Sequence, residues 1–166
     1  MYRASALIIL SLSMASSAVA RDSLGVFEGW GAFRDPGPGQ NGPRCYAIAQ
    51  PSTRRGQTPK GFVAVGTWPR QRVRGQLHFR LSRARAPHAP VTLTVGERRF
   101  TLVAGQVDAW APDQRGDAQI VAAMRSASSM SLSSINADGR GFADSYALRG
   151  AATAMDAAAL GCARLR

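Results

Sequence analysis

The chain has 166 residues, with 21 basic and 10 acidic side chains, a formal net charge of +11 and 45% hydrophobic residues. This length and composition predict one globular domain with a single core and leave no room for a second domain. The two histidines and two cysteines lack the spacing of a zinc site, and the aspartates lack that of a calcium loop. The sequence therefore predicts no metal site and no cofactor.

Residues 1–20 have the layout of a cleavable secretory signal. Arg3 precedes an apolar stretch at residues 6–14, and small side chains lead to Ala18 and Ala20 before the expected cleavage point. A membrane anchor is the alternative, but the apolar stretch is about half of the ~20 residues that a spanning helix needs. We expect residues 21–166 to remain as one domain without a transmembrane segment, and to be periplasmic or secreted.

Short strand patterns fill most of the chain after this leader, separated by Gly, Pro and Asp segments. Leu77, Phe79 and Leu81 alternate with polar side chains, which is the period of a half-buried strand. Gly96 and Glu97 predict a two-residue hairpin turn, because glycine readily adopts a positive φ. Strands are predicted over residues 26–33, 45–50, 62–68, 76–82, 91–95, the hairpin arm with Phe100 and Leu102, 129–135 and 142–148.

Two short helices are predicted, over residues 118–126 and 151–160. Asp117 is the expected N-cap of the first helix. Thr153 and Asp156 have the spacing of a capping box in the second, which Gly161 is expected to end. A membrane-surface helix is the alternative for the second segment, but that segment lacks a basic face. The whole pattern predicts a mainly β fold, an antiparallel β-sandwich with one or two short peripheral helices.

Cys45 and Cys162 lie near the two ends of the exported domain. Export takes them into an oxidising compartment, and two cysteines allow only one intramolecular pairing. A reactive thiol is the alternative, but neither cysteine belongs to a Cys-x-x-Cys pair. The sequence therefore predicts a disulfide that fastens the C-terminal tail to an early strand.

A dense group of arginines follows the third predicted strand. Such a positive field attracts phosphate-rich or carboxylate-rich partners, which outside the cytoplasm are anionic lipid head groups, polysaccharides or a host surface. A solvated basic surface that reflects an arginine-rich composition is the alternative interpretation. The predicted anion-binding patch consists of Arg70, Arg72, Arg74, Arg80, Arg83 and Arg85.

Nucleic-acid binding and catalysis have little support in the residues. Only Phe79 lies among the clustered arginines, whereas nucleic-acid modules interleave basic side chains with stacking aromatics. His78 and His88 are predicted to be surface histidines, and the sequence has no Gly-x-Ser-x-Gly elbow. We predict a protein that is not an enzyme and does not bind nucleic acid. A small periplasmic hydrolase acting on envelope polymers remains the alternative.

Several segments of packing and turn residues form a recognisable set. They are Trp30, CYAIAQ at residues 45–50, DAQIVAAMR at 117–125, SMSL at 129–132, GRGFADSYALRG at 139–150 and Cys162. Together they resemble the invasion-associated locus B family of alphaproteobacterial exported proteins. The resemblance implies a compact β-sandwich in the periplasm or at the cell surface, in a family linked in some pathogens to host-cell invasion. It brings no established catalytic residue.

The leader, the basic surface and this resemblance together predict an exported, envelope-associated binding or interaction protein of unknown ligand. Its partner is expected to be an anionic envelope component or a protein, and the sequence does not define its oligomeric state. A stress-related structural or chaperone-like protein is a further alternative.

Overall fold

The computed structural model of the protein describes residues 21–37, 42–52 and 60–163. The predicted leader, residues 1–20, lies outside these ranges. Within them the chain forms a ten-stranded sheet, two α-helices and one short 3-10 helix. Neither of the two α-helices in this part of the chain has the length and apolar character needed to cross a membrane.

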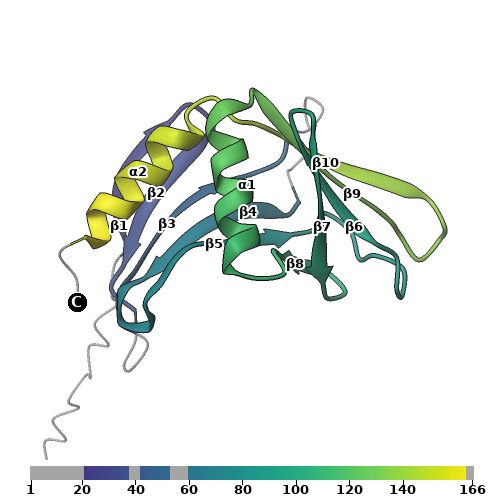
Figure 1. The fold of residues 1–166 in the computed structure, drawn as a ribbon, viewed down its shortest axis with the longest axis horizontal. Coiled ribbons are helices and arrows are strands. Elements are labelled where there is room, and N and C mark those ends of the chain that lie inside the picture. The colour runs from purple at the N-terminus through teal and green to yellow at the C-terminus, as the bar shows by residue number, and fades with distance from the viewer. Residues whose placement is uncertain (1–20, 38–41, 53–59, 164–166) are drawn as a thin grey trace, which may run out of the picture.

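The first five strands form an antiparallel meander that makes one half of the sheet (Figure 1). Each strand pairs with its neighbour in the sequence. The strands are β1 (Asp22–Phe27), β2 (Trp30–Asp35), β3 (Arg44–Ala49), β4 (Phe62–Trp68) and β5 (Val73–Arg80), and the 3-10 helix η2 (Pro69–Gln71) joins the last two.

The prediction of one strand over residues 26–33 is wrong, because the chain reverses direction inside that range. Glu28 and Gly29 form a two-residue turn, which places Phe27 opposite Trp30. Glu28 takes a positive φ of 55°. In turns this conformation is common for glycine and asparagine and uncommon for glutamate. The turn residues therefore gave little sign of the hairpin.

The other five strands form the second half of the sheet. The sheet order runs β1-β2-β3-β4-β5-β8-β7-β6-β9-β10. The predicted Gly96–Glu97 turn is confirmed, since Val95 lies opposite Arg98 and Gly96 has a φ of 56°. The strands are β6 (Val91–Val95), β7 (Arg98–Ala104), β8 (Asp108–Trp110), β9 (Ser129–Ile135) and β10 (Gly141–Ala147).

The two halves meet at the short strand β8, which connects β5 to β7 through only a few residue pairs. The ends of the sheet are also tied together, because the Trp30 indole N–H on β2 donates a hydrogen bond of 2.9 Å to the Ala147 carbonyl on β10. The predicted mainly β, antiparallel fold with two short helices is confirmed, and the bent sheet is consistent with the predicted sandwich.

The helices α1 (Gln114–Ser126) and α2 (Ala151–Cys162) lie side by side (Figure 1), with α2 on the first half of the sheet and α1 where the two halves meet. α2 packs over β1 to β4, and α1 packs against β5 and β6. Buried alanines on α2 meet strands that also bury small side chains, so the helix backbone lies close to the sheet. The buried alanines are Ala151, Ala154 and Ala158 on α2, with Ala32, Ala47 and Ala49 on β2 and β3.

Three predicted helix-end signals are wrong. The N-cap of α1 is Asp113, whose carboxylate accepts the Gly116 N–H, and Asp117 lies in the first turn. α2 begins after Gly150 without a side-chain cap, so Thr153 and Asp156 form no capping box. Gly161 lies inside α2, where a Cβ would collide with Leu24 of β1. This glycine therefore permits close packing and does not end the helix.

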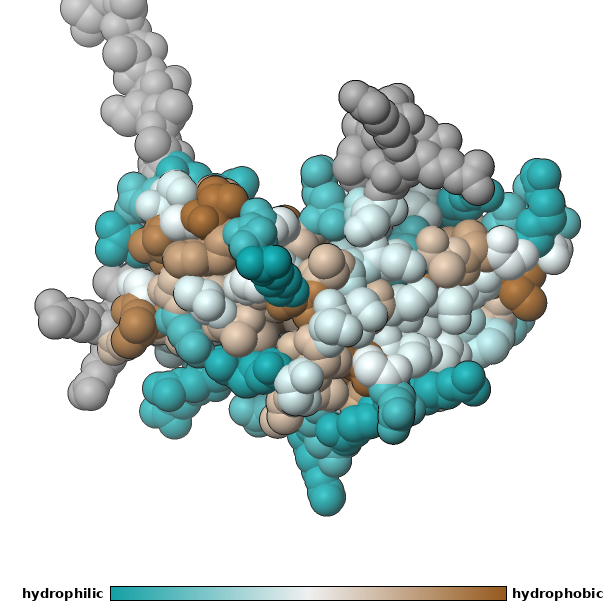
Figure 2. Space-filling model, turned by 90° about the horizontal axis from the view of Figure 1, so that it is seen from above, coloured by the Kyte–Doolittle hydropathy of each residue, from teal (hydrophilic) through white to brown (hydrophobic). Residues whose placement is uncertain are grey.

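Apolar and polar surface are distributed unevenly over the molecule. Figure 2 shows most of the brown apolar surface toward the α2 half, while the other half is mainly pale, with teal side chains along its edge and a small brown area near its far end. Leu160 on α2 and Val26 on β1 are 74% and 71% exposed. Val103, Trp110 and Ile135 on the other half are also exposed, so both halves carry exposed apolar side chains.

The disulfide between Cys45 and Cys162 is present and joins β3 to the last turn of α2. The two Cα atoms are 5.8 Å apart, and the bond closes a loop with a sequence separation of 117 residues. Both cysteines are buried. The crosslink therefore fixes the C-terminal helix on the early strands.

Reduction of this disulfide is expected to lower the free energy of unfolding by up to about 4 to 5 kcal/mol, because the unfolded chain regains the entropy of a long open loop. Chemical denaturation with and without reductant measures the effect. The C45A/C162A double variant is the control, since reductant should not change its stability. Equal stability of the oxidised and reduced wild-type protein would contradict the prediction.

Candidate functional site

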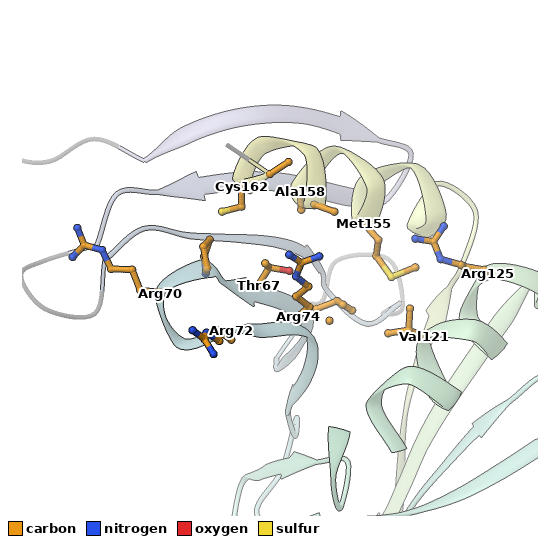
Figure 3. A pocket seen from close by; sticks show the side chains of 14 residues that line it. Thr67, Arg70, Arg72, Arg74, Val121, Arg125, Met155, Ala158 and Cys162 are labelled. Carbon is orange, nitrogen blue, oxygen red and sulfur yellow. The ribbon is translucent and has the colours of Figure 1, made fainter. Parts of the chain in front are cut away.

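A groove of about 980 Å³ lies between the β4–β5 hairpin, α1 and α2 (Figure 3). The sheet contributes its lower wall and the two helices contribute its sides. Its lining consists of Val65, Thr67, Pro69, Arg70, Arg72, Arg74, Gly75, Val121, Arg125, Met155, Ala158, Ala159, Cys162 and Ala163.

The floor of the groove is apolar. Val65 on β4 and Met155, Ala158 and Cys162 on α2 are all buried. Val121 on α1 is partly buried against the same core. Cys162 belongs to this floor, so the disulfide that holds α2 in place also forms part of the site.

Three arginines of the β4–β5 hairpin line the groove. Arg74 projects into the space between the hairpin and α2, while Arg70 and Arg72 lie nearer the hairpin tip (Figure 3). η2 begins at Pro69, whose fixed φ suits the first helical position, and thereby turns the chain between the two strands. A short segment of chain therefore supplies three arginines to the lining of the groove. Arg74 points toward α2, whereas the Arg70 side chain extends away from α2 and lies against Gly42 (Figure 3).

Arg72 adopts a left-handed backbone conformation with a φ of 57°. Its N–H donates a hydrogen bond of 3.1 Å to the Pro69 carbonyl and ends η2. Glycine is the residue that takes this conformation without steric cost, whereas an L-residue with a Cβ loses on the order of 1 kcal/mol. An arginine therefore occupies a position where backbone stability alone favours glycine.

The acidic side chains do not neutralise these three arginines. All ten acidic residues belong to the described part of the chain, and none of their carboxylates lies within ion-pair distance of Arg70, Arg72 or Arg74. The ion pairs involve other basic residues, and Asp113, Asp117 and Asp144 accept backbone N–H groups instead. The groove thus keeps a net positive potential.

A fourth arginine, Arg125, lines the α1 end of the groove (Figure 3). Its guanidinium donates to the Asp156 carboxylate on α2 at 2.6 Å, with the two side chains 42% and 57% exposed. This hydrogen bond raises the pKa of Arg125 and lowers the pKa of Asp156. The pair links the two helices, and Asp156 therefore competes with any anion that would bind Arg125.

Asp117 positions α1 beside the groove. Its buried carboxylate accepts the Leu77 N–H of β5 at 2.8 Å, one helical turn before Val121. Burial raises the pKa of Asp117, since the low-dielectric surroundings disfavour the charged form, while the Leu77 hydrogen bond acts in the opposite direction. Asp117 therefore has a structural role that the sequence did not reveal.

The six arginines of the predicted patch do not form one continuous surface. Arg70, Arg72 and Arg74 line the groove, whereas Arg80 pairs with Asp108 at 2.9 Å on another part of the sheet. The Arg85 guanidinium donates to the carbonyls of Ala86, Ala89, Ala104 and Gly105 and so fastens a loop. Arg83 is exposed and does not line the groove.

The histidines lie outside the groove. His78 Nε2 is 2.9 Å from an Asp108 carboxylate oxygen, and its ring stacks on Trp110 at a centroid distance of 5.4 Å. His88 is exposed. Over residues 21–37, 42–52 and 60–163, no three His, Cys, Asp or Glu side chains gather in a way that could hold a metal ion.

The sequence interpretation missed the helical side of the groove. Val121 and Arg125 are four residues apart on α1, and Met155, Ala158, Ala159 and Cys162 share one face of α2. Both spacings are helical, so each face could have been found separately. Nothing in the sequence shows that these faces meet residues near position 70.

The fold and the groove define a small, basic, disulfide-bonded β domain with two helices packed side by side on a bent sheet. A family model for the invasion associated locus B (IalB) protein matches residues 31–159. The chain therefore belongs to the IalB family, as its motifs suggested.

One solved structure shows the same fold. It is the crystal structure of invasion associated protein B from Bartonella henselae, with a TM-score of 0.59 and 16% sequence identity over 82% of this chain and 96% of that chain. No curated protein matches the sequence at a significant level. At this identity the likeness establishes the fold, and the groove has to be interpreted from its own residues.

Arg72→Gly is expected to relieve the left-handed backbone and make the protein more stable than Arg72→Ala by about 1 kcal/mol, because only glycine removes the Cβ clash. Both variants lose the guanidinium, so both should bind anions more weakly than the wild-type protein. Chemical denaturation of the two variants measures the difference. Equal stabilities would show that the backbone at residue 72 is not strained.

Proposed function

We propose that this protein is an exported, envelope-associated binding protein that holds an anionic ligand in the groove between α1, α2 and the β4–β5 hairpin. One observation carries the proposal: Arg70, Arg72 and Arg74 line the groove without a carboxylate partner in the described part of the chain. Uncompensated guanidinium groups around an opening attract anions and bind them through charge-assisted hydrogen bonds.

The periplasm or the extracellular space is the proposed location. The leader at residues 1–20, the disulfide and membership of a family of exported proteins support it. Disulfides persist in these compartments and are rare in the cytosol. An anionic component of the envelope is therefore the proposed partner, and residues 21–166 the mature domain.

A hydrolase has less support than a binding protein. Hydrolysis by a triad needs a nucleophile, a histidine and a carboxylate in mutual contact. His78 and Asp108 meet, but their hydrogen-bond partners within the described ranges include no serine hydroxyl, and neither residue lines the groove. We therefore propose binding without catalysis.

Replacing Arg70, Arg72 and Arg74 together by glutamine is expected to weaken retention on isolated envelope fractions at low salt by at least about tenfold, since each charge-assisted hydrogen bond contributes roughly 1.5 to 3 kcal/mol. Co-sedimentation of the purified exported protein at low and high salt measures this. Wild-type retention should also fall at high salt, where surface charges are screened.

The matched control replaces Arg83, Arg99 and Arg115 by glutamine. These three arginines are exposed, do not line the groove and pair with no carboxylate in the described part of the chain. Both variants lose three positive charges and so have the same net charge. Equal loss of retention in both variants would mean that general charge and not the groove binds the envelope. Absence of wild-type retention at low salt would remove the proposal.

Asp156→Asn is expected to strengthen anion binding by about two- to threefold, because it releases Arg125 from an exposed ion pair that is worth only about 0.2 to 1 kcal/mol. The same small value predicts little change in stability. Titration calorimetry with inorganic pyrophosphate, paired with thermal unfolding, measures both quantities. Weaker pyrophosphate binding in this variant would show that the Asp156 contact orders Arg125 for binding instead of competing with the ligand.

A further inference from the structure

We infer that the ligand of the groove is an anionic amphiphile, a single phosphate or carboxylate head group on an unbranched alkyl or acyl chain. This inference rests on the proposed anion-binding function and specifies the part of the ligand that the arginines do not contact. The observation behind it is the division of the groove into an arginine rim and an apolar floor.

The size of the groove exceeds what a small anion needs. Its volume is about 980 Å³, which is at the upper end of the range of small-molecule sites. A phosphate ion bound at Arg74 fills only a small part of this volume, and the rest of the lining includes Val65, Val121 and Met155. Water next to those side chains finds few hydrogen-bonding partners, so an apolar group gains free energy by displacing it.

The floor suits a flexible chain. Val65, Met155 and Ala158 offer no hydrogen-bonding side-chain groups, and they are continuous with the protein core. Methionine adapts its shape readily to an apolar partner. Arg74 reaches into the space between the hairpin and α2 (Figure 3), where it can hold a head group while the chain extends along α2.

The lining disfavours sugars and nucleotides. Among the described residues that line the groove, none is aromatic and only Thr67 carries a hydroxyl group. Nucleotide bases bind by stacking on aromatic rings, and polar sugar hydroxyls need hydrogen-bonding partners when they are buried. An acyl or alkyl chain needs neither an aromatic ring to stack on nor hydrogen-bonding partners.

Binding of dodecyl phosphate, octyl phosphate and inorganic phosphate to the purified exported protein tests the inference by titration calorimetry below the micellar concentrations. Each pair of methylene groups that leaves water should tighten binding about tenfold, so dodecyl phosphate should bind at least about tenfold more tightly than octyl phosphate. Dodecanoate extends the comparison: binding of either dodecyl anion supports the inference, and the tighter one identifies a phosphate or a carboxylate head group.

A variant that fills the groove separates the floor from the rim. Ala159 is exposed on α2 and lines the groove, so Ala159→Trp should fold and remove the advantage of the longer chain while inorganic phosphate still binds. Ala143→Trp is the matched control, because Ala143 is an exposed alanine on β10 outside the groove. This control should bind dodecyl phosphate like the wild-type protein.

Two results would overturn the inference. If octyl and dodecyl phosphate bind equally, the floor contributes nothing, and anion binding as the proposed function still stands. If uncharged dodecyl maltoside binds as tightly as dodecyl phosphate, the arginine rim does not select the head group. By contrast, failure of every anion to bind, together with absence of envelope retention, would remove the proposed function itself.

Discussion

The docking of α2 on the first half of the sheet is the constraint on which the rest of the structure depends. Small side chains on both surfaces bring the helix backbone close to β2 and β3, and Gly161 leaves room for Leu24 at the end of the helix. Such contacts are individually weak, because an alanine buries little apolar area. The Cys45–Cys162 disulfide compensates by limiting the freedom of the unfolded chain. The position of α2 in turn defines one side of the groove.

The acidic side chains pair with some of the basic side chains and not with the arginines of the β4–β5 hairpin. Most carboxylates are occupied at the sheet and at the helix starts: Asp108 holds His78 and Arg80, Asp113 caps α1, and Asp117 fastens α1 to β5. The hairpin arginines receive no such partner, although the chain carries twice as many basic as acidic residues. The left-handed backbone of Arg72 marks the hairpin as a place where the fold carries strain that does not serve stability.

Much of the fold could be predicted from the sequence because it is encoded in local patterns. The alternation around Leu77 and Phe79, the Gly96–Glu97 turn and the single possible cysteine pairing each involve one physical rule. The failures have equally specific causes. Glu28 turns the chain without a turn-forming residue at its positive φ, and Asp113 takes the cap because the helix starts one turn earlier than its apolar positions suggest. The groove could be predicted only in part: the arginine-rich hairpin was visible, but its meeting with Val121 and Met155 depends on how helices distant in sequence pack.

The disulfide makes the docking of α2, and with it one wall of the groove, depend on the oxidation of Cys45 and Cys162. Cys162 is both a wall of the groove and the residue that anchors the last turn of α2. Without the disulfide, the helix is held by its alanine contacts and by the exposed Arg125–Asp156 pair, which contribute little. Formation of the disulfide shifts this balance toward the docked helix. The wall that faces the three hairpin arginines is therefore most stable when Cys45 and Cys162 are joined, so closing the disulfide also stabilises the groove.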